Sequence, residues 1–152
     1  MHQQIKDVYQ GIEVVKQECI GYVRKRVGTA LRKLKKENPG LGGKGKLTDA
    51  MIDKMQNYYG IAIRANVGNL NAMKNSILAS FFHCASSESR PLHQYCPVGP
   101  ESWCKYQQDK NSYKHGSGLP LPIIAKVRPI YQRLSDDGKS VFMARLKIKT
   151  SP

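Results

Sequence analysis

Hydrophobic side chains recur at steps of three and four residues in the first part of the chain, the pattern of a helix with one buried face. This stripe consists of Ile20, Val23, Val27, Leu31 and Leu34. It predicts a helix from about Ile12 to Lys36, weakened in its middle by Gly28. Asn38-Pro39-Gly40 ends this helix, because proline and glycine do not continue one.

Two further stripes predict a pair of antiparallel helices over residues 48–84. Thr48 is a suitable N-cap for the first of them, and Asn69, which follows Gly68, for the second. The buried stripe of the first is Ile52, Met55, Tyr59 and Ile63, and that of the second is Leu70, Met73, Ile77 and Phe81.

The helical pattern disappears over residues 83–120, where Ser, Pro and Gly cluster. It returns at Leu121–Leu134, with Pro129 expected to kink or split the helix, and we extend this C-terminal helical part to residue 146. The 152 residues therefore form one mainly α domain in our prediction. Its parts are a basic helix (12–36), a basic glycine-rich loop (38–47), the hairpin (48–84), the irregular segment (83–120) and the C-terminal part (121–146).

Charge changes the picture from a generic helical domain to one with a preferred class of partner. Lys and Arg number 25 against 11 Asp and Glu, a net charge of +14, which favours nucleic acid over acidic membranes or acidic proteins. No apolar run reaches the roughly 18–20 residues of a membrane span. The first ten residues, MHQQIKDVYQ, do not resemble a secretory signal, so we expect the four cysteines to be reduced or to bind metal.

The positive charge is concentrated in the basic helix and the loop after it. Nine side chains in this stretch are basic: Arg24, Lys25, Arg26, Arg32, Lys33, Lys35, Lys36, Lys44 and Lys46. Glu37 is the single acid among them. Such a face suits the phosphate backbone of nucleic acid and carries little sequence information of its own. The loop lacks the Gly-Lys-Ser/Thr ending of a nucleotide-binding phosphate loop.

The irregular segment contains a candidate metal site. His93 and Cys96 stand three residues apart, and a turn rich in Pro and Gly brings the chain back to Cys104. A structural zinc ion takes four nitrogen or sulfur ligands in a tetrahedron. The fourth ligand could come from His83, Cys84 or His115. We favour His83, because Cys84 continues the apolar stripe of the preceding helix, where a thiol is a small core residue.

Catalytic chemistry is not evident in the sequence. The eleven acidic residues are scattered, and no pattern supports a cysteine nucleophile with its base. Asp49 and Asp53 share one helix face, which is more typical of a solvated first turn than of a metal pair. We therefore assign no catalytic residue, and no small-molecule substrate or membrane partner is expected.

Three motifs in order resemble the Mutator-like transposase domain of animal DNA transposons. They are ECIGYVRKRVGTALRKL at 18–34, GKLTD at 45–49 continued by IDKMQNYYG at 52–60, and His93-x₂-Cys96-Pro with Ser102-Trp-Cys104. The resemblance extends over roughly residues 9–134. The four candidate ligands His83, His93, Cys96 and Cys104 match positions of that family. The family's Cys-x₂-His in the basic helix is not matched, because Tyr22 follows Cys19 at the third place.

The resemblance implies a cut-and-paste transposase of the DDE type, with a ribonuclease-H-like core, three carboxylates and Mg or Mn. In that family a helical insertion lies between the second Asp and the final Glu, and this chain is similar to that insertion. The ribonuclease-H-like core is therefore expected to be largely absent from it. We expect a nuclear, zinc-stabilised, DNA-binding fragment, inactive as an enzyme alone, with self-association as in other transposases. The alternative is a domesticated nucleic-acid-binding module with no role in transposition.

Overall fold

The computed structural model describes residues 24–136, and the fold in this range is mainly α, with no β-strand. Its elements are a helix over residues 24–37, a 3-10 turn η1 (Pro39–Leu41), and the helices α2 (Asp49–Ala65), α3 (Leu70–Ala85), α4 (Lys105–Gln108) and α5 (Leu121–Asp136). The predicted helical positions 12–23 and 137–146, together with Cys19, lie outside the described residues.

The helical hairpin begins where the sequence supplies side-chain caps. The Thr48 hydroxyl accepts a hydrogen bond from the Met51 backbone N at 3.1 Å, and the Asn69 side chain accepts one from Ala72 N at 3.1 Å. Both bonds satisfy a backbone N–H that has no partner inside its helix. The turn between α2 and α3 contains Gly68 at a φ of 87°, a conformation that glycine adopts without strain.

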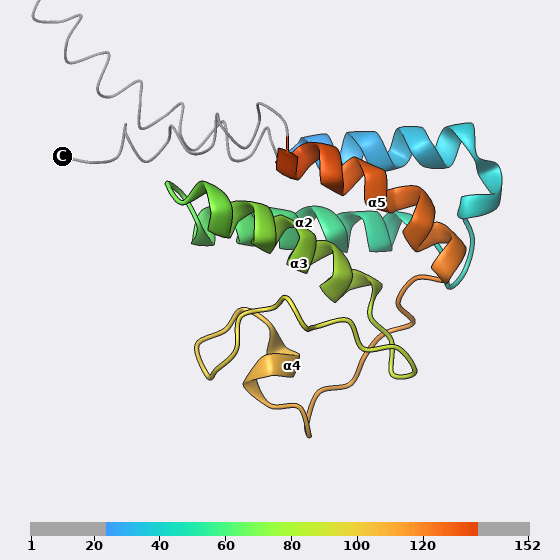
Figure 1. Ribbon diagram of the computed structural model, residues 1–152. Coiled ribbons are helices and arrows are strands. Elements are labelled where there is room, and N and C mark those ends of the chain that lie inside the picture. The colour runs from blue at the N-terminus through green and yellow to red at the C-terminus, as the bar shows by residue number, and fades with distance from the viewer. Residues whose placement is uncertain (1–23, 137–152) are drawn as a thin grey trace, which may run out of the picture.

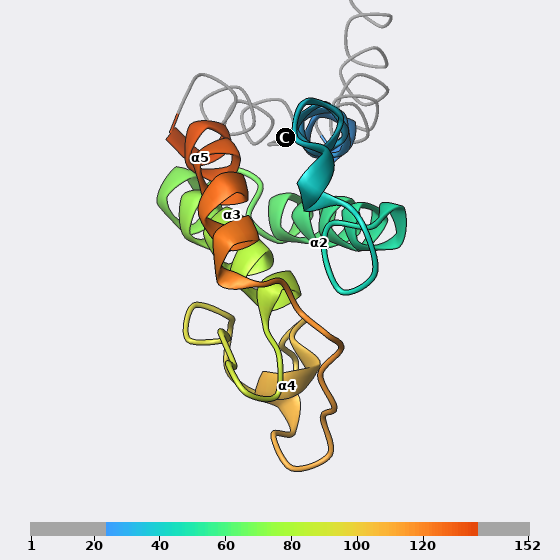
Figure 2. The ribbon, with the colours of Figure 1, turned by 90° about the vertical axis from the view of Figure 1, so that its right-hand side faces the viewer.

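The core lies where α3 packs against α2 on one side and α5 on the other (Figures 1 and 2). Tyr131 of α5 stacks on Phe81 of α3, with ring centroids 4.7 Å apart, and meets Tyr59 of α2 edge-on at 6.2 Å. All three rings are fully buried. The helix over residues 24–37 adds Val27 and Leu31 to the same core, with Leu34 packed against it, so the described part of the stripe faces inward.

Pro129 does not split the C-terminal helix, contrary to one of our two expectations. The helix α5 runs unbroken from Leu121 to Asp136. Pro129 itself is exposed, and so is Ala125, the residue whose carbonyl would have accepted the missing N–H four residues later. Water can hydrate a carbonyl on this exposed face, which offsets the hydrogen bond that proline cannot donate.

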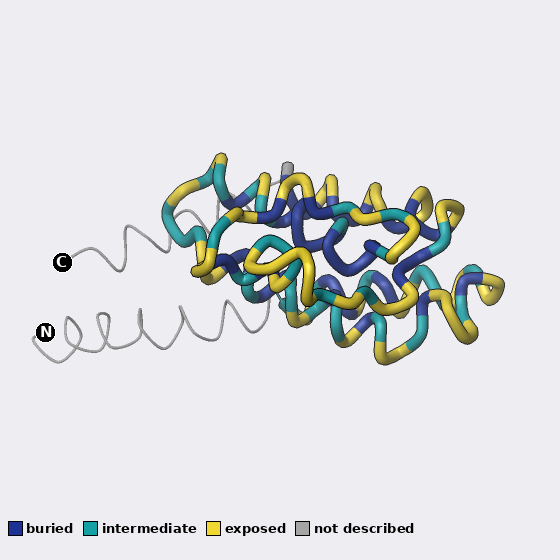
Figure 3. Tube along the Cα trace, turned by 90° about the horizontal axis from the view of Figure 1, so that it is seen from below, coloured by how far each residue is buried: buried dark blue, intermediate teal, exposed yellow. Residues whose placement is uncertain are grey.

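The irregular segment leaves the helices at Ala85 and rejoins them at Leu119, where Leu119 N donates to the Ala85 carbonyl at 3.1 Å. Gly118 makes this closure possible, because its φ is +65° and a Cβ there would lie 2.6 Å from the Ala85 oxygen. Between these two points the chain forms a lobe below α3 that contains α4 (Figures 1 and 2). Figure 3, viewed from the side of this lobe, shows exposed outer turns around a buried interior.

Candidate metal centre and basic surface

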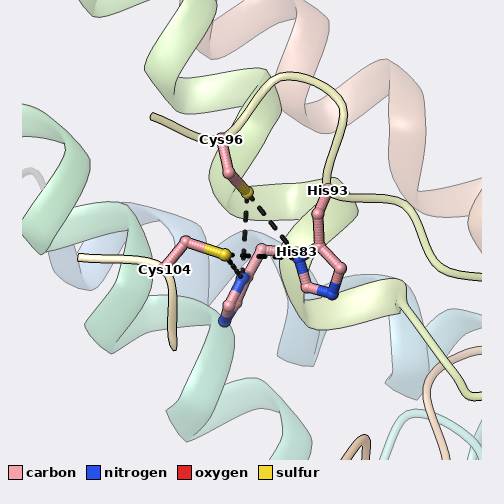
Figure 4. Close-up of side chains that lie close together, drawn as sticks. All are labelled: His83, His93, Cys96 and Cys104. Atoms are coloured by element: carbon pink, nitrogen blue, oxygen red, sulfur yellow. Dashed lines mark hydrogen bonds between the residues drawn. The ribbon is translucent and has the colours of Figure 1, made fainter. Parts of the chain in front are cut away.

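Four potential ligands converge inside the lobe (Figure 4). His83 comes from the last turn of α3, His93 and Cys96 from the turn that follows, and Cys104 from the N-cap position of α4. One ligand atom from each of these side chains lies within 4.8 Å of those of the others. The structure therefore brings together the four residues that the sequence analysis selected.

The distances inside the cluster fit a tetrahedral ion. The Cys96 Sγ lies 3.9 Å from Nδ1 of His83 and 3.8 Å from Nδ1 of His93, and the Cys104 Sγ lies 3.4 and 3.5 Å from the same two atoms. In a tetrahedral zinc site, with bonds of about 2.3 Å to sulfur and about 2.0–2.1 Å to nitrogen, each sulfur lies about 3.6 Å from each nitrogen. The four separations lie on both sides of that value.

Local hydrogen bonds explain why the two arms meet. Cys96 N donates to the His93 carbonyl at 3.0 Å, a turn that puts both side chains on one side of the chain. The Ser102 hydroxyl donates to the Pro97 carbonyl at 2.5 Å and accepts from Cys104 N at 3.0 Å. This serine therefore ties the returning arm to the outgoing one and fixes where Cys104 enters the cluster.

Burial keeps the two imidazoles and the Cys96 thiol uncharged before any ion binds. None of the four residues is more than 4% exposed. Burial, followed by the charge of His93, lowers the pKa of His83 to about 3, and burial, followed by His115, lowers the pKa of His93 to about 4. Burial, followed by Cys104, raises the pKa of the Cys96 thiol. Neutral imidazoles, the form that coordinates a metal, are therefore present at neutral pH.

Aromatic rings enclose the cluster. Tyr58 of α2 approaches His83 with ring centroids 4.4 Å apart, and Trp103 meets the same ring edge-on at 5.3 Å. Tyr106 stacks on His93 at 4.2 Å and 17°, and the Gln107 side chain donates to the His93 carbonyl at 2.8 Å. These contacts exclude water and hold the His93 ring in one orientation.

Neither of the two other residues considered as a fourth ligand is a member of the cluster. Cys84 is fully buried in the hydrophobic core, with its Sγ 4.0 Å from the Lys54 carbonyl. His115 has its Nε2 2.8 Å from Nε2 of His93, the ring nitrogen that does not face the thiols. Nothing in the local sequence indicated this histidine pair, because 22 residues of irregular chain separate its members.

The nine basic residues lie on the helix over 24–37 and on the loop after it. The side chains differ in exposure: Lys25, Arg32, Lys33, Lys36, Lys44 and Lys46 are exposed, and Arg24, Arg26 and Lys35 are half-buried. Two of them bind acids of α2, with Arg32 Nη2 at 3.3 Å from Asp53 Oδ1 and Lys35 Nζ at 3.1 Å from Asp49 Oδ1. The acid pair Asp49 and Asp53 thus anchors the basic helix.

Packing fixes the position of this basic surface further. Arg24 lies over Gly60 of α2, so closely that a Cβ at Gly60 would come within 2.7 Å of its Cδ. The loop is held at Leu47, which is fully buried and donates its N–H to the Leu41 carbonyl at 3.0 Å. A pocket opens between helix and loop, lined by Arg32, Lys35, Lys36, Pro39 and Asp49.

Comparison with known proteins decides the family. The family model of the Mutator-like transposase matches residues 1–104. The chain belongs to the Mutator-like transposase family. The match includes the basic helix and the hairpin, and it ends at Cys104, so all four clustered residues of this transposase chain fall inside it. No curated protein and no solved structure matches the chain. No helix among residues 24–136 is long and apolar enough to cross a membrane.

Proposed function

We propose that this transposase chain is a DNA-contacting helical region in which one structural zinc ion holds the irregular lobe together. The observation that carries the proposal is a basic helix anchored by core contacts and two ion pairs, with most of its cationic side chains facing solvent. The catalytic carboxylates of the transposase lie in another part of the folded enzyme in this proposal. Its place of action is the nucleus, where the DNA is.

Zinc is the metal that this donor set favours. Two sulfur and two imidazole nitrogen ligands in a tetrahedron are typical of zinc, and four protein ligands leave no open position for a substrate. Burial of all four ligands supports a structural site over a catalytic one. The ion, when bound, supplies cross-links between α3, the following turn and the start of α4. This chain's own residues supply the ligands and exclude water.

The basic surface supports DNA as the partner. Its nine Lys and Arg side chains are opposed by three acids in the same region, Glu37, Asp49 and Asp53. Five of the six exposed cations, Lys25, Lys33, Lys36, Lys44 and Lys46, make no ion pair with any residue of the described range. Cations in this state exchange solution counterions for phosphates, so binding to DNA is expected to weaken steeply as salt rises.

A charge-matched pair of triple variants tests the DNA proposal. We expect Lys33→Gln, Lys36→Gln and Lys44→Gln together to weaken binding to a duplex at least tenfold near 0.1 M salt. The logarithmic salt slope should also become shallower by about 0.9 for each phosphate that is no longer neutralised. The control carries the same charge change at three exposed lysines elsewhere, Lys105, Lys114 and Lys126. Equal losses in the two triple variants would show that net charge, not this surface, binds the DNA.

Metal analysis tests the zinc proposal. We expect about one zinc ion per reduced chain, retained through gel filtration and absent from the His93→Ala and Cys104→Ala variants. Cobalt substitution should give the d–d absorption of a tetrahedral site with two thiolates. A reduced, folded wild-type chain that holds no zinc would contradict the proposal.

A further inference from the structure

His93 is the one clustered ligand whose second ring nitrogen has a side-chain partner inside the lobe. Its Nδ1 faces the thiols of Cys96 and Cys104 at 3.8 and 3.5 Å, and its Nε2 lies 2.8 Å from Nε2 of His115. The outer nitrogen of His83, by contrast, is buried without a hydrogen-bond partner among the described residues. The two imidazoles of the cluster are therefore supported differently.

Coordination through Nδ1 determines which of the two histidines donates the hydrogen bond between them. An imidazole that coordinates through Nδ1 carries its proton on Nε2, so His93 donates and His115 accepts. His115, accepting at Nε2, must then carry its own proton on Nδ1. That atom lies 3.2 Å from the Glu88 Oε1, at ion-pair distance although off the direction of a hydrogen bond. The three groups thus lie in series from the cluster to the surface, joined by a hydrogen bond at the first step and by an ion-pair contact at the second.

The backbone of His115 holds the Glu88 side chain beside the His115 ring. Its Oε1 accepts a hydrogen bond from the His115 backbone N at 2.6 Å. The hydrogen bond from the His115 backbone, followed by the nearby His115 side chain, lowers the pKa of the Glu88 carboxyl, so it is ionised at neutral pH. The Glu88 side chain is 66% exposed and that of His115 only 3%. The negative charge therefore stays in water while the imidazole between it and the cluster is dry.

We propose that His115 and Glu88 are positioning residues for the metal, which hold His93 in the tautomer and orientation that present Nδ1 to the ion. This inference rests on the proposed zinc site. Partners of this kind, a carboxylate or carbonyl behind a ligating histidine, raise the basicity of the ligand and reduce the number of orientations it samples. Their removal typically costs about 10–100-fold in metal affinity.

The test compares zinc affinities, by chelator competition, of chains that differ at the outer partners. His115→Phe retains a ring and removes the acceptor, and we expect it to bind zinc about 10–100-fold more weakly. His115→Gln retains an acceptor and should recover most of that loss. Glu88→Gln should have a smaller effect than His115→Phe, because its amide oxygen still accepts from the backbone. Tyr106→Phe is the packing control, since it preserves the ring stacked on His93.

A second measurement separates positioning from a general structural role. Nitrogen-15 spectra of the zinc-loaded chains report the tautomer of His93 and the hydrogen bond of its Nε2–H. We expect that proton to lose its hydrogen bond in His115→Phe and to keep it in Tyr106→Phe. Equal affinity in wild type and His115→Phe, or equal losses in the Phe and Gln variants, would overturn the inference and leave the zinc site standing. A wild-type chain without zinc would overturn the proposed metal centre itself.

Discussion

The closure of the lobe at Gly118 gives a sharply controlled prediction. Replacing Gly118 by alanine places a Cβ at 2.5 Å from the Ser86 carbonyl oxygen and 2.6 Å from that of Ala85, in a residue whose φ is +65°. Both neighbours are backbone atoms, so no side-chain rotation relieves the overlap. The local chain must move, and the hydrogen bond from Leu119 N to Ala85 O is the nearest interaction that this movement would break.

The expected cost has two parts. A side chain in the left-handed region costs about 1–2 kcal/mol. Loss of one partly buried backbone hydrogen bond costs about 1 kcal/mol more. Alanine also stiffens the unfolded chain, which returns about 0.4–1 kcal/mol. We therefore expect Gly118→Ala to lower the free energy of unfolding of the zinc-saturated protein by about 2 kcal/mol.

Alanine variants at two other glycines of the same lobe separate the cost of backbone strain from the cost of the contacts with the carbonyl oxygens. Gly99 has a φ of +114° and open space around its Cβ position, so Gly99→Ala should show the backbone strain alone, about 1 kcal/mol. Gly116 has open space and no left-handed backbone, so Gly116→Ala should be neutral or slightly stabilising. Urea unfolding followed by circular dichroism, with zinc in excess, measures all three.

The order of the three variants is the decisive result. If Gly118→Ala is no less stable than Gly99→Ala, the carbonyl oxygens at the base of the lobe do not constrain the fold, and the reasoning fails. An equally large destabilisation in Gly116→Ala would show that any alanine in the lobe is harmful.

Three further outcomes follow from the site and the caps. Cys104→Ala should abolish zinc binding. Cys84→Ala should retain the ion and lower the free energy of unfolding by about 1 kcal/mol, because it leaves a small cavity in the core. Loss of zinc in both variants would contradict the ligand assignment. Because burial raises the pKa of the Cys96 thiol, this group is protonated at pH 7 in the free protein, and zinc binding must expel its proton. Zinc affinity should therefore fall at least about tenfold per unit decrease in pH, measured by competition, and a flat profile would exclude thiolate ligation by Cys96. Thr48→Ala removes the cap of α2 and should lower the free energy of unfolding by about 1 kcal/mol in thermal or urea unfolding. Thr48→Ser, whose hydroxyl can still accept the bond, should keep most of that stability.

Helices were predictable from the sequence where one face is buried and the ends carry caps. Asn69 and Thr48 begin α3 and α2 as expected, because a side-chain oxygen near the first free N–H is a local property. The helical wheel also separated His83 from Cys84, since adjacent residues of a helix point about 100° apart. The effect of Pro129 was harder to predict, because it depends on whether the carbonyl four residues earlier faces water, which is a tertiary property.

The interior of the lobe was predictable only in part. The spacing from His93 to Cys96 indicated a turn that presents two ligands, and the structure contains that turn. The contact between His93 and His115 and the role of Gly118 could not be derived, because both depend on how two stretches of irregular chain lie beside each other. Periodicity carries no information there, and only the three-dimensional course of the chain places these residues together.

Because the chain leaves and rejoins the helices at adjacent residues, Ala85 and Leu119, we expect the lobe to open as a unit of its own. The lobe can lose its order while α2, α3 and α5 stay packed together, so amide exchange within residues 86–118 should follow the loss of the ion and exchange in the helices should follow global unfolding. Added length at an exposed position such as Asn111 should also be tolerated, since doubling a flexible loop costs only about 0.6 kcal/mol in closure entropy. We therefore expect this part of the molecule to tolerate changes of length that the packed helices above it do not.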